Sequence, residues 1–164
     1  MSNLSSISYF RNFVFGVEDS LVSTVGLLSG IAIAEVPRST IFLTGFILIF
    51  VEAFSMAAGS FLSEYSAEGY AVGAETPSRK DFISGIIMFF SYFVSGFIPL
   101  FPYFVWSTRG AFAISVILSV LALFILGIVG AKVSKTNMAK NGLRMAVVGG
   151  VAIVVGIIGG SIIP

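Results

Sequence analysis

Three acidic residues lie inside stretches of sequence that are otherwise apolar, and these residues have the greatest potential for chemistry. Glu18 and Asp19 fall in the first apolar stretch, and Glu52 falls near the middle of the second. A charge at that depth in a membrane costs at least about 2.5 kcal/mol, so such an acid indicates a functional site by default. No Lys or Arg lies at a matching depth. The acids therefore predict a bound cation, a protonated carboxyl group or a water-filled cavity.

Helical spacing surrounds Asp19 with small and polar residues. Residues at intervals of three and four share one face of a helix, and on this face they are Gly16, Asp19, Ser23, Gly26 and Gly30. We expect Asp19 to point along a groove between helices. The glycines alone are equally well explained as a stripe for helix packing or a dimer interface. That explanation does not account for the buried acid.

A second functional face is predicted around Glu52. It contains Glu52, Met56, Gly59 and Ser63, with Ser55 and Ser60 at its edges. Glu52 and Met56 are one helical turn apart, about 6 Å along the axis. A carboxylate binds any divalent cation, whereas a thioether favours softer ions over magnesium and calcium. The pair predicts a site for ferrous iron, manganese or a similar ion; the alternative for Met56 is a gap filler in an apolar helix.

Three other acids, Glu18, Glu64 and Glu68, have surroundings that the spacing defines less well than those of Asp19 and Glu52. Glu18 is about 100° around the helix from Asp19, so the two cannot face the same way, and we expect Asp19 to face the site. Glu64 and Glu68 are one turn apart at the end of the second segment. They either collect cations at an entrance by raising the local concentration, or simply form a solvated helix end.

The composition excludes a soluble globular protein. The 164 residues are 57% hydrophobic and 10% charged, against about 25% charged in soluble domains. The chain contains no Cys and no His, which removes disulfides, thiolate nucleophiles, imidazole bases and the usual zinc sites. A net charge of +1 argues against nucleic acid as a partner.

The elements that must position these residues are membrane-spanning helices. Five apolar runs are long enough to cross a hydrocarbon core of about 30 Å, at residues 13–34, 39–62, 82–105, 110–131 and 143–163. We therefore expect an all-α, polytopic membrane protein with one five-helix domain over residues 1–164. Seven Lys and Arg residues fall on the side of the N-terminus and two on the other. This places the N-terminus in the cytosol and the C-terminus on the far side.

Several stretches resemble the vacuolar iron transporter family. RNFVFGVEDSLVSTVGLLSG resembles the family's first helix, and EAFSMAAGSFLSE its Glu-Ala-x-Ser-Met-Ala-x-Gly signature. FVSGFIPLFPYF resembles its third-helix segment with two prolines, and GLRMAVVGGVAIVVGIIGG its fifth helix. The resemblance covers nearly the whole chain.

The resemblance implies a homodimer that exports ferrous iron, and in many members manganese, from the cytosol in exchange for protons. The path lies between the protomers, and by position it includes Asp19, Met56 and the matching acid Glu52. Residues that line the path or its entrance would be Glu18, Ser23, Ser55, Ser60, Glu64 and Glu68. Such a protein is no enzyme and holds no permanent cofactor. Its membrane would be the plasma membrane in a prokaryote, or a vacuolar or other organellar membrane in a eukaryote.

The chain departs from the family pattern in several places. Asn12 and Ser60 stand where acids are frequent, and Ser20 replaces a glycine. The cytosolic metal-binding domain of some members does not fit between Ser63 and Asp81, so the chain resembles the compact branch. The alternative functions are a passive cation channel or a structural subunit of a membrane complex, which need the same acids. An intramembrane enzyme is the least supported, because no nucleophile stands beside them.

Overall fold

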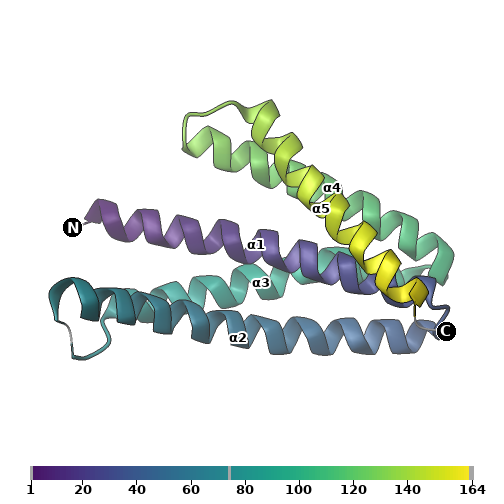
Figure 1. Ribbon diagram of the computed structural model, residues 1–164, viewed down its shortest axis with the longest axis horizontal. Coiled ribbons are helices and arrows are strands. Elements are labelled where there is room, and N and C mark those ends of the chain that lie inside the picture. The colour runs from purple at the N-terminus through teal and green to yellow at the C-terminus, as the bar shows by residue number, and fades with distance from the viewer. Residues whose placement is uncertain (1, 74, 163–164) are drawn as a thin grey trace.

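The computed structural model describes residues 2–73 and 75–162, and within them it contains five α-helices and no strand. The helices are α1 (Ser2–Ile33), α2 (Arg38–Val72), α3 (Arg79–Val105), α4 (Thr108–Val133) and α5 (Met138–Ile162), as Figure 1 shows. All five are long and apolar enough to cross a membrane. The predicted all-α fold with five candidate spans is confirmed. Position 163, the expected end of the fifth span, lies outside the described residues.

Two helices run well beyond their apolar segments. Helix α1 begins at Ser2 rather than near residue 13, and α2 continues to Val72 rather than ending near residue 62. The 35 residues of α2 correspond to about 50 Å of helix, which exceeds a hydrocarbon core of about 30 Å. The last turns of α2 therefore extend past the apolar part of the bundle, alongside the start of α1.

The connection between α2 and α3 is short, and both helix ends that it joins are capped. Gly73 ends α2 in a left-handed conformation (φ 69°), and its N–H donates to the carbonyl of Gly69 at 3.0 Å. Ser78 and Asp81 form a capping box at the start of α3, in which the Ser78 N–H donates to Asp81 Oδ2 at 2.7 Å. Helix α3 therefore begins beside the end of α2.

Helix α3 contains two prolines, Pro99 and Pro102, a residue type that usually kinks or ends a helix. Helix α3 runs through both and ends at Val105. The Ser115 hydroxyl of α4 donates to the carbonyl of Pro99 at 2.7 Å, and the Trp106 N–H donates to the carbonyl of Pro102 at 2.9 Å. These bonds satisfy backbone carbonyls near the end of the helix.

Helix α1 lies in the middle of the bundle (Figure 1). It packs extensively on α3 and α5, while α2 packs along α3 and α4 along α5. The direct contact between α1 and α2, which run antiparallel, is much smaller. In α1 and in α3, 50% of the most apolar 18-residue stretch is buried inside the bundle, whereas in α5 the share is 11%. Of the helices that contact α1, α2 makes the smallest contact with it.

An apolar cluster closes one end of the bundle. We call the end with the start of α1 and the α2–α3 connection the N-terminal end, and the opposite end the distal end (Figure 1). The cluster comes from four helices and is at most 1% exposed: Leu28, Ile41, Ile49, Leu100, Tyr103 and Ala111. The outer surface also carries large apolar side chains, such as Phe54 and Phe104, as a lipid-facing surface requires.

Candidate functional site

Two acids from neighbouring helices lie near enough to interact in the middle of the bundle. Asp19 on α1 and Glu52 on α2 are both half-buried and interact electrostatically. Among the described residues, no salt bridge involves either acid. Two carboxylates without a basic partner can hold a divalent cation, or a proton in its absence. The structure thus brings together two of the acids that the sequence singled out.

Tyr92 of α3, which the sequence analysis did not select, lies beside this pair. It is fully buried and interacts electrostatically with both acids. Its hydroxyl is 2.7 Å from the hydroxyl of Ser23, and its carbonyl accepts a hydrogen bond from Ser20 at 2.7 Å. Hydrogen bonds therefore tie α1 to α3 next to Asp19. The available signal was a polar run, Ser91, Tyr92 and Ser95, inside an apolar segment.

A cleft of about 590 Å³ opens between α1, α2 and α3. It is lined by Arg11, Asn12, Phe15, Met56, Gly59, Ser60, Ser63 and Met88. Asn12 and Phe15 precede Asp19 on α1, and Met56 and Ser60 follow Glu52 on α2, so the cleft lies on the N-terminal side of the two acids. The structure therefore places Met56 and Ser60 in one cleft next to the acid pair.

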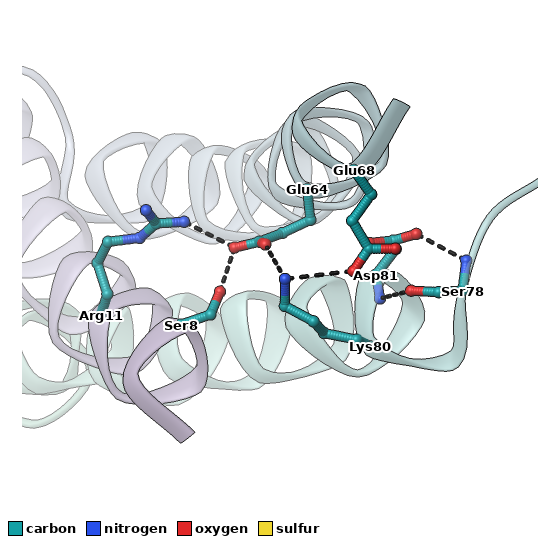
Figure 2. A network of polar contacts seen from close by, with 7 residues as sticks. All are labelled: Ser8, Arg11, Glu64, Glu68, Ser78, Lys80 and Asp81. Atoms are coloured by element: carbon teal, nitrogen blue, oxygen red, sulfur yellow. Dashed lines mark hydrogen bonds and ion pairs between the residues drawn. The ribbon is translucent and has the colours of Figure 1, made fainter. Parts of the chain in front are cut away.

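An ion-pair network crosses the N-terminal end of this region (Figure 2). Glu64 of α2 accepts hydrogen bonds from Ser8 and, at 2.6 Å, from Arg11, both on α1. Its second oxygen is 3.0 Å from Lys80 Nζ of α3. Lys80 also pairs with Glu68 at 3.3 Å. The network therefore joins three helices around one carboxylate whose side chain is only 7% exposed.

The prediction that Glu64 forms a solvated helix end is wrong. Its side chain is buried, and both oxygens contact basic groups. The reason is the helical start of α1, which brings Ser8 and Arg11 beside the extension of α2. Glu68, with 26% of its side chain exposed, is the more accessible of the two acids. Neither carboxylate is without a basic partner, which weakens a role in collecting cations.

We expect Glu64→Gln to destabilise the protein more than Glu68→Gln. Breaking a buried ion pair costs about 3–5 kcal/mol, and the cost falls to about 2–3 kcal/mol where the partners, like Arg11 and Lys80 here, reach solvent. Glu68→Gln removes a pair in which both side chains are partly exposed, and it is expected to cost less than about 1 kcal/mol. The fraction of monodisperse protein after heating in detergent measures both. An equal loss of stability in the two variants would contradict the conclusion that Glu64 is the buried centre of the network.

Glu18 faces a different part of the bundle from Asp19. It lines a separate cavity of about 380 Å³ between α1, α4 and α5, together with Asn141 and Met145. This agrees with the rotation of about 100° between consecutive helical residues. Ser55, another expected lining residue, is exposed on α2.

Three of the four expected packing glycines make close contacts within the chain. Gly16 packs on α3 side chains, and Gly26 and Gly30 pack on the backbone of α5. A Cβ on Gly30 would lie 2.6 Å from the carbonyl oxygen of Gly156. A Cβ on Gly59, in contrast, would have no described atom within 4 Å. The first three glycines therefore set helix distances inside one protomer, and Gly59 faces open space.

One chain supplies few charged ligands. Within residues 2–73 and 75–162, no group of three or more His, Cys, Asp or Glu residues gathers in a way that could hold a metal ion. Divalent cations usually take about six ligands. A divalent cation held by Asp19 and Glu52 would therefore need further ligands from water, neutral donors or a second copy of the chain.

These features define an integral, multi-pass membrane protein with a polar site inside an apolar helix bundle. The family model of the VIT family matches residues 10–73 and 70–161. The chain belongs to the VIT family, which confirms the predicted family. Membership indicates membrane transport of metal ions as the general function, and family members are transporters rather than enzymes. None of the curated proteins compared with the sequence matches it.

Proposed function

We propose that the protein is a homodimer that exports ferrous iron, and also manganese, from the cytosol in exchange for protons. The observation that carries this proposal is the acid pair Asp19 and Glu52, which lies on neighbouring helices and has no basic partner among the described residues. Such a pair at this depth needs a cation or a proton to offset its charge.

Exchange follows from competition for the same oxygen atoms. A metal ion binds the deprotonated carboxylates of Asp19 and Glu52, so binding releases protons. Without metal, a carboxyl group in poorly solvated surroundings favours its neutral form and takes up a proton. Metal and protons then move in opposite directions if the two states open to opposite sides of the membrane.

The shape of the bundle supports access from the N-terminal side. The cleft that Asn12 and Ser60 line lies on that side of Asp19, whereas the buried apolar cluster lies toward the distal end. The distribution of Lys and Arg predicts that the N-terminal side faces the cytosol. A second copy, meeting the first along α1, would double the carboxylates and supply the ligands that one chain lacks.

Flux measurements in vesicles test this proposal. We expect Fe²⁺, added outside under anaerobic conditions, to enter vesicles with an acidic lumen faster than vesicles at equal pH. Protons should leave the lumen as the metal enters, and Mn²⁺ should behave in the same way. Empty vesicles provide the control, because they report leakage of the membrane itself.

Two other outcomes would each reject the exchange mechanism. Metal flux that is unaffected by the pH difference and moves no protons would indicate a passive channel. The absence of flux for either ion would leave the family assignment in place but remove Fe²⁺ and Mn²⁺ as substrates.

A further inference from the structure

The cleft beside the acid pair contains methionine side chains from two helices. Met56 comes from α2 and Met88 from α3. Met88 is 2% exposed, and its sulfur lies 3.0 Å from the position that a Cβ on Gly16 would occupy. The glycine in α1 therefore leaves the space that the Met88 sulfur fills. The sequence analysis selected Met56 but not Met88.

Two polar side chains in the same cleft have no hydrogen-bond partner in the described part of the chain. They are Asn12, through Nδ2, and Ser60, through Oγ. Asn12 is 5% exposed and Ser60 8%. An unpaired buried polar group costs about 1–3 kcal/mol, so it usually marks a bound water, ion or ligand. Rotation of the Asn12 amide would present its oxygen to the cleft instead of its nitrogen.

We propose that this cleft, whose lining contains no carboxylate, is a binding site for a partly hydrated, relatively soft divalent cation. The charge of Arg11, which also lines the cleft, is compensated by its ion pair with Glu64. The thioethers of Met56 and Met88 are its selective ligands, and Asn12 and Ser60 contribute oxygen atoms. The proposal rests on the proposed function, because the site lies just before the Asp19–Glu52 pair on the N-terminal side.

The two neighbouring sites contain different ligands and therefore have different roles. Thioethers favour Fe²⁺ over Mg²⁺ and Ca²⁺, which prefer hard oxygen ligands. A site without carboxylate ligands binds the ion weakly and so releases it onward. The cleft therefore selects the cation, and the carboxylates exchange it for protons.

Substitution by leucine separates metal binding from packing. Methionine often fills gaps between helices, and leucine keeps nearly the same volume but removes the sulfur. Met145 provides a matched control, since it lies on α5 and lines the separate cavity that holds Glu18. A merely structural role predicts that Met88→Leu and Met145→Leu leave metal binding unchanged.

Equilibrium dialysis with Fe²⁺ tests the site directly. The variant Asp19→Asn/Glu52→Gln removes both carboxylates, and we expect it to retain weak Fe²⁺ binding. Adding Met88→Leu should weaken that binding on the order of tenfold, equivalent to about 1.4 kcal/mol. Adding Met145→Leu should not. Absence of Fe²⁺ binding in the starting variant, or equal binding by the two leucine variants, would overturn the proposal.

Transport provides the second readout and separates the two proposals. In the otherwise unchanged protein, Met88→Leu should lower Fe²⁺ flux relative to Mn²⁺ flux several-fold, and an unchanged ratio would overturn the selective role of Met88. If the unchanged protein carries no metal while the variant without carboxylates binds Fe²⁺ through Met88, the proposed function fails and the binding site stands. If the unchanged protein transports metal normally but Met88→Leu does not affect Fe²⁺ binding, the proposed function stands and the binding site fails.

Discussion

Asp19→Asn is expected to abolish metal transport while the protein remains folded. The substitution keeps the size of the side chain but removes a carboxylate that faces Glu52 inside the bundle. Loss of a hydrogen-bond partner behind a metal ligand already costs about 10- to 100-fold. We therefore expect the loss of the ligand itself to reduce Fe²⁺ flux in vesicles by at least about 100-fold. Elution as a single species in detergent would show that the fold is retained.

Glu18→Gln is the matched control for this experiment. It removes an acid at the adjacent position of the same helix, but one that faces the cavity between α1, α4 and α5. We expect Glu18→Gln to retain most of the flux. Normal flux in Asp19→Asn, or an equal loss in both variants, would contradict the assignment of Asp19 to the transport path.

Gly156→Ala is expected to disrupt the packing of α5 on α1. The added Cβ would collide with the backbone carbonyl of Gly26, and Gly160 faces the carbonyl of Gly30 in the same way. A helix backbone cannot move aside as a flexible side chain can. Overpacking of this kind costs about 1–3 kcal/mol, and the upper part of that range applies because the clash involves backbone atoms. Thermal stability in detergent measures the effect.

Gly150→Ala tests whether the contact, rather than glycine itself, matters. Position 150 lies on the same helix, and a Cβ there would have no described atom within 4 Å. Alanine favours a helix over glycine by about 1 kcal/mol, so Gly150→Ala should leave stability unchanged or raise it. Similar destabilisation by both substitutions would argue against close α1–α5 packing.

The number and type of helices were predictable from the sequence, but their ends were not. Apolar runs of suitable length predict spans because the membrane interior excludes unpaired backbone groups. The start of α1 and the end of α2 are polar, so the same signal stops near residues 13 and 62. Their helical form depends on contacts between the two segments, such as those of Arg11 and Ser8 with Glu64.

Part of the candidate site was predictable for a similar reason. Asp19 and Glu52 stand out because a charge in an apolar segment is costly wherever its partners lie. The positions of Tyr92 and Met88 beside them depend on how α3 packs against α1. That register comes from tertiary packing, and spacing along one helix carries no information about it. The pairing of Glu64 with Lys80 was missed for the same reason.

The apolar cluster at the distal end also affects how the transport rate should depend on the number of protein chains per area of membrane. Leu28, Ile49 and Leu100 are fully buried in the interior of a single protomer, away from the cleft beside Asp19. In the proposed homodimer, the transport route follows a surface that a second chain completes. At low density in the membrane, where most chains are alone, transport would then rise with the square of the amount of protein. Dilution alone would switch the activity off and leave each chain intact.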